Sequence, residues 1–303
     1  MRTDTRMSTT AGQLGIEHQT VFGLPPVEFV HLAADLGCRY IAAVLSGNPV
    51  NPHGYPPFSL RDDAALRRRT IAAMREREVS ISLGEGFVVR PGSDMRGYAA
   101  DLDVMAELGV AMVNTVTMDP DLDRSHDEFG TLAEMASERG MQTTVEFAPS
   151  LTIKDLDLAL AAVRHVARPD FRLLIDTMHL ARSGHTPADL AAVDPALIAY
   201  AQLSDNTLQQ RGTVYREDSI NRMVPGEGEL PLRDILAVLP PDIVIGLEVP
   251  MLSAAQAGEP TEERARRCVQ AARDLLTAEA LRPPGTLRPL GAPSTAHPST
   301  IER

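Results

Sequence analysis

The feature that most constrains the fold is a regular alternation of short apolar segments with amphipathic segments between about residues 14 and 280. The apolar segments are rich in β-branched residues and apolar on both faces, as strands of a parallel sheet covered by helices must be. The amphipathic segments repeat their apolar residues at the spacing of a helix. The predicted strands span residues 14–21, 38–45, 79–87, 111–117, 143–148, 172–178, 198–205 and 242–250.

The helical segments complete eight strand–helix units. The first predicted helix, 25–37, has prolines at its start and Gly37 at its end, the expected asymmetry. The units predict an α/β protein with the (β/α)8 TIM-barrel fold, as a single domain over residues 13–280. A doubly wound sheet is the alternative, but residues 15–26 lack the glycine-rich phosphate turn that usually follows its first strand. The other predicted helices span 61–78, 93–109, 125–140, 152–166, 186–193, 230–239 and 261–281.

The connecting segments indicate which end of the barrel carries function. Connections from a helix to the next strand are short, whereas 46–60 and 206–229, which follow the second and seventh strands, are long. Long loops on one face mark the catalytic end of a barrel. Residues 1–12 are predicted to be a flexible N-terminal segment that is not a signal peptide, and the Pro-rich residues 281–303 a flexible tail. No apolar run approaches the about 20 residues of a membrane span.

Composition excludes several classes of function. The net charge of -12 argues against nucleic-acid partners, which normally require a basic surface. Lys154 is the only lysine, and we expect it in the first turn of a helix, so Schiff-base and PLP chemistry are disfavoured. Cys38 and Cys268 lack metal-type spacing and are predicted to be small core residues. This usage suits a reducing compartment, and we expect a cytoplasmic protein.

Polar residues recur where the predicted strands end, and in a barrel these ends converge on one cavity. Three carboxylates facing one cavity would repel one another and lose hydration, and a divalent cation would relieve both problems. For a single carboxylate, the alternative is a core ion pair with an arginine. Oxygen-dominated ligation favours Mn2+, Mg2+ or Co2+ over structural zinc. The strand-end residues are His18, Glu85, Asn114, Glu146, Asp176, Gln202 and Glu248.

The order and spacing of these residues resemble a known superfamily. The pattern Glu146, Asp176-x-x-His179, Gln202-x-x-Asp205 and Glu248, with "PGEGEL" at 225–230, is similar to the xylose-isomerase-like TIM-barrel superfamily of sugar phosphate isomerases and epimerases. The resemblance covers about residues 13–280. It implies that one divalent ion is held by four residues, and that barrels of this kind often form homo-oligomers. The implied metal ligands are Glu146, Asp176, Gln202 and Glu248.

The resemblance also implies the chemistry. We expect a metal-dependent isomerase or epimerase of carbohydrate metabolism that removes an α-proton from a sugar or polyol ketone through a metal-stabilised enediolate. Glu146 and Glu248 would act as acid and base as well as ligands, and His179 would contact the substrate and exchange protons. Family epimerases usually have His where this chain has Gln202, whereas some dehydratases have Gln. The alternative is therefore a metal-dependent dehydratase (a lyase) of an inosose or 3-dehydroshikimate, with His179 as base.

Further residues are predicted to bind a small-molecule substrate. His18 and Glu85, at the ends of the first and third strands, are expected to contact it, although either could simply be a polar residue at the barrel mouth. The loop 206–229 carries Arg211, Arg216 and Arg222, and we expect Arg216 or Arg222 to face the cavity, where its planar fork can bind a carboxylate, phosphate or hydroxyl.

The remaining histidines are predicted to lie outside the site. His185 is expected just ahead of a helix cap at Thr186, and His53 belongs to the long second loop, where a lid role stays open. The other histidines are expected at the surface; they are His31, His126, His165 and His297.

Two other functions use the same barrel. A DNA-repair endonuclease would need a multi-metal cluster with many more histidines and a basic surface, which the charge of -12 and the single strand-end histidine argue against. A catalytically inactive barrel used as a binding subunit is disfavoured by the complete set of candidate ligands.

Overall fold

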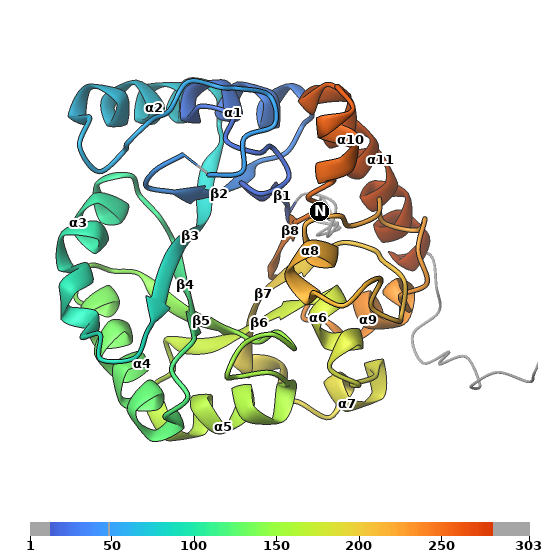
Figure 1. The fold of residues 1–303 in the computed structure, drawn as a ribbon. Coiled ribbons are helices and arrows are strands. Elements are labelled where there is room, and N and C mark those ends of the chain that lie inside the picture. The colour runs from blue at the N-terminus through green and yellow to red at the C-terminus, as the bar shows by residue number, and fades with distance from the viewer. Residues whose placement is uncertain (1–12, 48, 281–303) are drawn as a thin grey trace, which may run out of the picture.

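A computed structural model describes residues 13–47 and 49–280, so the predicted segments 1–12 and 281–303 lie outside the described residues. Eight parallel strands pair in chain order and close into a barrel in which β1 lies beside β8 (Figure 1). This confirms the predicted (β/α)8 TIM barrel. The strands are β1 (Leu14–Ile16), β2 (Tyr40–Val44), β3 (Ser80–Val89), β4 (Met112–Thr117), β5 (Gln142–Glu146), β6 (Phe171–Asp176), β7 (Ile198–Leu203) and β8 (Val244–Leu247).

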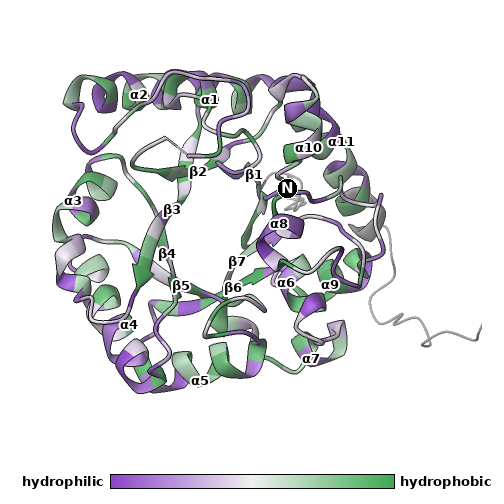
Figure 2. Ribbon diagram, in the orientation of Figure 1, coloured by the Kyte–Doolittle hydropathy of each residue, from purple (hydrophilic) through white to green (hydrophobic). Residues whose placement is uncertain are grey.

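The helices surround the barrel, and Figure 1 shows them as an outer ring. Figure 2 shows predominantly hydrophobic strands, whereas the helices carry hydrophilic and hydrophobic residues, as expected where one helix face packs on the sheet. The helices are α1 (Pro26–Asp35), α2 (Ala64–Arg77), η2 (Met95–Tyr98), α3 (Ala99–Glu107), α4 (Leu122–Ser137), α5 (Leu156–Val166), α6 (Thr177–Arg182), α7 (Pro187–Ala191), η3 (Pro195–Leu197), α8 (Tyr215–Ser219), α9 (Leu232–Val238), α10 (Leu252–Gln256) and α11 (Thr261–Ala280).

Three short α-helices were not predicted: α6, α8 and α10, each in a segment that follows a strand. Each is only five or six residues long, so no helical period is visible in the sequence. One predicted helix also begins later than expected. Asp155 is the N-cap of α5 and accepts a hydrogen bond from the Leu158 amide at 3.0 Å, so Lys154 precedes the helix.

Two further expectations are corrected by burial and by strand length. Glu85 lies within β3, because this strand continues to Val89 beyond an irregular register with β4. His126 on α4 is buried. The ring of His165 on α5 packs against its ring, with 5.1 Å between the two ring centroids. His297 lies outside the described residues.

The other local predictions agree with the structure. Thr186 caps α7 in a capping box with Asp189, so His185 stands just ahead of a helix. Cys38 and Cys268 are buried, and burial raises the thiol pKa to about 11 and about 12, respectively. Within 13–47 and 49–280, the structure contains no helix with the length and apolar character to cross a membrane.

Candidate active site

The four residues implied as metal ligands lie at the carboxyl ends of neighbouring strands. Glu146 and Asp176 are the last residues of β5 and β6, Gln202 lies near the end of β7, and Glu248 directly follows β8. The parallel register places Asp176 opposite Gln202 and brings all four strand ends to one end of the barrel. Asp176, Gln202 and Glu248 are each at most 2% exposed. The sequence therefore places four polar side chains in a desolvated ring.

Arg222 crosses this ring from the loop after β7. Its Nη1 contacts Asp176 Oδ2 and also donates to Ser204 Oγ at 3.1 Å, and its Nη2 lies 2.8 Å from Glu248 Oε2. Burial alone would lower the arginine pKa, but the two carboxylates raise it above its ordinary value. Burial would likewise raise the pKa of Asp176, and Arg222 and His179 hold it below the usual range. Asp176 and Glu248 therefore both form an ion pair with an arginine, which was the sequence-based alternative to metal binding. Substrate binding by Arg222 stays a prediction.

Glu146 has no such cation. Its Oε2 accepts a hydrogen bond from Asn114 Nδ2 at 2.6 Å, and its Oε1 lies 3.6 Å from His179 Nε2. Among the described residues no arginine or lysine forms an ion pair with it. Burial, followed by the charges of Glu248 and Asp176, raises the Glu146 pKa well above its ordinary value.

His179 is positioned by the Asp-x-x-His spacing itself. Asp176 caps α6 and accepts a hydrogen bond from the His179 amide at 2.8 Å, which fixes the histidine in the first turn of the helix. The ring Nδ1 lies 2.7 Å from the Tyr215 hydroxyl. Burial lowers the His179 pKa to about 4, so the imidazole is neutral near pH 7. The side chains of Glu146, Asp176 and His179 each offer a ligand atom within 4.8 Å of the others, so this group could also hold a metal ion.

The opposite side of the ring comes from β3 and from the turn after β1, where His18 lies because the strand ends at Ile16, earlier than predicted. His18 Nδ1 lies 3.0 Å from Glu85 Oε2, and Gln202 Nε2 donates to Glu85 Oε1 at 3.1 Å. Gln19 Nε2 donates to Glu248 Oε1 at 2.9 Å. The Gln202 amide group is therefore oriented by Glu85, while its buried Oε1 has no partner among the described residues. A buried carbonyl oxygen without a donor costs about 1–3 kcal/mol, which a bound cation would recover.

Another buried carboxyl lies deeper in the barrel. Glu17 is fully buried, and its Oε1 accepts a hydrogen bond from the Tyr200 hydroxyl at 2.7 Å. The Tyr200 hydroxyl also lies 3.1 Å from Ser82 Oγ. A Cβ at Gly246 would stand 1.6 Å from Glu17 Oε1, so only glycine fits there. Burial and the charges of nearby glutamates raise the Glu17 pKa well above its ordinary value.

The loop after β7 is held by Asp205. Its carboxylate accepts hydrogen bonds from the amides of Gly226 at 2.9 Å and Leu230 at 3.1 Å, which anchors the "PGEGEL" segment. A Cβ at Gly228 would lie 2.3 Å from Asp205 Oδ1, so this glycine is needed for the close approach. In the same loop, Arg211 Nε binds Asp218 Oδ1 at 2.8 Å. Arg211 therefore stabilises the loop through a contact within it.

A cavity of about 380 Å³ opens over β1, β2 and β3, beside the ring. It is lined by His18, Gln19 and Glu85, and farther out by Arg61, Asp101 and Arg216. Sequence reasoning predicted His18, Glu85 and Arg216 here but passed over Gln19 and Arg61.

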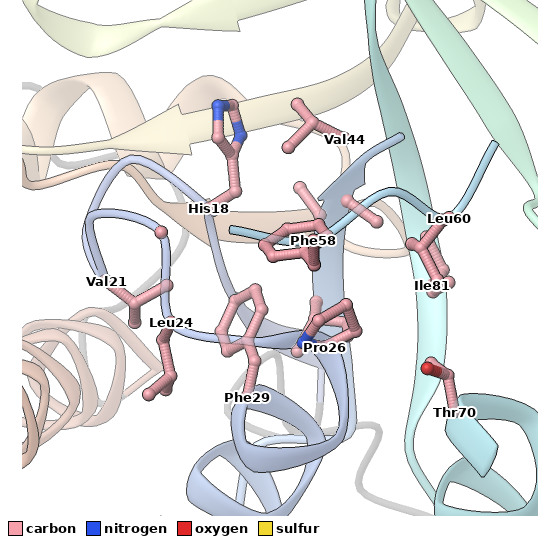
Figure 3. A pocket seen from close by; sticks show the side chains of 14 residues that line it. His18, Val21, Leu24, Pro26, Phe29, Val44, Phe58, Leu60, Thr70 and Ile81 are labelled. Carbon is pink, nitrogen blue, oxygen red and sulfur yellow. The ribbon is translucent and has the colours of Figure 1, made fainter. Parts of the chain in front are cut away.

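A separate apolar pocket of about 30 Å³ lies next to His18. Figure 3 shows its wall of Val21, Leu24, Phe29 and Phe58, with the His18 ring directed away from Leu24 and Phe29. The small size and mostly apolar lining indicate a gap in the packing of side chains.

Residues 30–275 match the family model described as a xylose isomerase-like TIM barrel. The chain belongs to this family. The match confirms the resemblance drawn from the strand-end residues. No curated protein matches the sequence.

Solved structures share the fold at low sequence identity. The IOLI protein with a bound zinc atom superposes with a TM-score of 0.72 at 18% identity, over 88% of this chain and 99% of that one. D-psicose 3-epimerase with D-fructose gives 0.66 at 14%, over 87% and 99%. The probable 3-DHS dehydratase AsbF of Bacillus anthracis gives 0.67 at 10%, over 86% and 98%. The same fold therefore occurs in an epimerase and in a probable dehydratase, and at these identities the likeness establishes the fold alone.

Proposed function

We propose that this protein is a divalent-metal-dependent isomerase or epimerase that acts on a sugar or polyol ketone. The observation that carries the proposal is the buried Gln202 Oε1, which has no partner among the described residues and lies on the same ring of strand ends as the buried Asp176 and Glu248 and the partly buried carboxylate of β5. A hard cation binds oxygen ligands, and a free amide oxygen beside clustered carboxylates supplies them. The D-psicose 3-epimerase structure shows that the same fold supports epimerisation in another protein.

The donor set fits Mn2+, Mg2+ or Co2+. Glu146, Asp176, Gln202 and Glu248 would hold the ion, and Glu146 in particular has no basic side chain paired with it among the described residues apart from the His179 contact. When bound, such an ion polarises a carbonyl and stabilises the negative charge that develops as an α-proton leaves.

Glu146 and Glu248 are suited to move the proton. They belong to β5 and β8, which are separated in the barrel by β6 and β7, so they can face a small substrate from two directions. One carboxylate removes the α-proton and the other returns a proton from its own side, which inverts a carbon centre. Burial raises the pKa of Glu146 well above its ordinary value and that of Glu248 to about 8, so both carboxylates take up a proton more readily than an exposed glutamate does. Neutral His179, held by Tyr215, is placed to bind a substrate hydroxyl.

Metal analysis tests the ligand set. Gln202→Ala should weaken Mn2+ binding by at least about 10-fold, the scale of losses at metal sites. The control is Gln209→Ala, which removes an exposed glutamine from the following loop. Equal Mn2+ affinity in Gln202→Ala and wild type would remove Gln202 from the ligands. A purified protein without divalent metal, whose stability and activity are unchanged by EDTA, would overturn the metal site.

Proton exchange tests the reaction. Metal-loaded protein incubated with a panel of ketoses in D2O should incorporate deuterium at the α-carbon, with a new isomer and no loss of water, as read by NMR. Absence of both exchange and turnover across the panel, in a protein that holds its metal, contradicts the isomerase proposal.

A dehydratase is the second candidate, and Gln202 favours it, because glutamine replaces the histidine that is usual in related epimerases. The neutral His179, 3.6 Å from Glu146, could then act as base, and loss of a β-hydroxyl would follow proton removal. A rise in enone or aromatic absorbance on addition of an inosose or 3-dehydroshikimate would support this candidate over the isomerase.

A further inference from the structure

We propose that the substrate carries an anionic group, a carboxylate or a phosphate, which Arg216 binds in the cavity over β1, β2 and β3. This inference rests on the proposed function and adds a substrate class to it. The cavity offers about 380 Å³, within the range of small-molecule sites. Its lining includes Arg61 and Arg216, which come from the loop after β2 and from α8.

The residues that line the cavity contact the ring that would hold the metal. His18 and Glu85 line the cavity, and Glu85 accepts the Gln202 amide at 3.1 Å. Gln19 lines it as well and donates to Glu248 at 2.9 Å. A substrate whose reacting carbons lie against the ring therefore extends its other end into this cavity.

The charges in the cavity favour an anion at its outer end. The guanidinium of Arg61 is held by Asp101 through Nε and Nη2, both at 2.6 Å, so this pair is neutral overall. His18 and Glu85 likewise form a pair at 3.0 Å. Arg216 has no carboxylate partner among the described residues, so its charge is uncompensated. A guanidinium fork matches the geometry of a carboxylate or phosphate.

The other two arginines of the same loop distinguish this role. Arg222 is buried between Asp176 and Glu248, and Arg211 is bound to Asp218. Both already have anionic partners within the protein. Arg216 is thus the arginine of this loop left to bind an anion from solution.

Direct binding provides a test that does not depend on activity. Inorganic phosphate and malonate are titrated separately into metal-free protein, so that neither anion can bind through the metal. With a net charge of -12, nonspecific anion binding is disfavoured, which makes a saturable signal informative. Arg216→Gln should weaken binding about 10- to 100-fold, the range for a charged hydrogen bond, and Arg216→Lys should restore part of it.

The matched control is Arg68→Gln, which removes one exposed arginine from α2 outside the cavity and should bind as wild type does. Binding of phosphate alone or of malonate alone would support the proposal and identify the group. Binding of neither anion, or equal binding by Arg216→Gln and wild type, would overturn it.

Turnover separates this inference from the proposed function. D-fructose, D-fructose 6-phosphate and D-fructuronate are compared by α-proton exchange with metal-loaded protein. We expect the ratio of kcat/KM for an anionic ketose to that for D-fructose to exceed one and to fall about 10-fold or more in Arg216→Gln. Exchange that is equal for all three and insensitive to Arg216 would refute the anion site while the isomerase survives. No exchange with any ketose, with anion binding intact, would refute the isomerase alone.

Discussion

The barrel interior contains two polar layers that handle buried acids in different ways. In the upper layer, Asp176 and Glu248 are paired with Arg222, and the Gln202 oxygen has no partner within residues 13–47 and 49–280. In the lower layer, Glu17 is fully buried and receives a hydrogen bond from Tyr200, but it has no cation partner in the part of the chain that the structure describes. The two layers are adjacent along β7, where Tyr200 belongs to the lower layer and Gln202 to the upper one. Their side chains point to the same face of the strand because they are two residues apart.

The difference shows how position within the barrel decides the charge of a carboxyl group. In the lower layer burial is the largest influence, and it raises the Glu17 pKa well above its ordinary value, which favours the protonated acid. In the upper layer, Arg222 holds the pKa of Asp176 low, so an anion persists there. The proposed cation site therefore lies at the strand ends, where a carboxylate stays ionised, and not one layer deeper.

Removal of Arg222 should have the largest effect on this contrast. Arg222→Met leaves Asp176 and Glu248 buried without their guanidinium, and breaking a buried ion pair costs about 3–5 kcal/mol. We expect urea unfolding of the metal-free variant to show a loss of this size. Saturating Mn2+ should recover part of the loss, because the ion supplies the missing positive charge.

The exposed Arg68→Met on α2 is the control, and it should change stability by no more than about 0.5 kcal/mol. A metal-free Arg222→Met protein as stable as wild type would mean that the two carboxylates do not depend on this arginine.

The sequence predicted the upper layer better than the lower one. Glu146, Asp176, Gln202 and Glu248 could be found because each interrupts an apolar strand at the end where loops are long. Glu17 stands in the same kind of segment, but β1 ends at Ile16, and no local signal distinguishes a carboxyl that enters the barrel from one at its mouth.

Contacts that depend on closure of the barrel could not be predicted either. Gln19 and Glu248 are 229 residues apart and meet because β1 lies beside β8. The arrangement of Arg222 depends on a long loop without a repeating pattern. Periodicity thus predicts which strands form, whereas pairings between distant loops require the coordinates.

The pH dependence of stability should reveal the protonated acid of the lower layer. Glu17 has a raised pKa in the folded state and an ordinary one when unfolded. Its contribution to stability is therefore complete below the unfolded pKa and is lost as pH rises through the folded pKa. Glu17→Gln mimics the protonated acid, so its stability relative to wild type should rise with pH, by at most about 1.4 kcal/mol per pH unit.

Chemical unfolding at pH 4.5, 6 and 8 would measure this difference. The exposed Glu76→Gln on α2 serves as control and should show no such trend. A constant difference between Glu17→Gln and wild type over this range would mean that Glu17 is ionised in the folded protein, and the contrast between the layers would be lost.

Tyr200→Phe should give the smallest effect and tests whether the lower layer depends on its hydrogen bonds. The hydroxyl donates to Glu17 at 2.7 Å and lies 3.1 Å from Ser82, so its removal leaves buried polar atoms without this partner. The expected cost is about 1–3 kcal/mol in the free energy of unfolding. Tyr40→Phe, at a side chain that is only partly buried, should cost less. If Tyr200→Phe is neutral while Glu17→Gln still stabilises at pH 8, then burial alone keeps the acid protonated, and the tyrosine contributes only packing to the barrel interior.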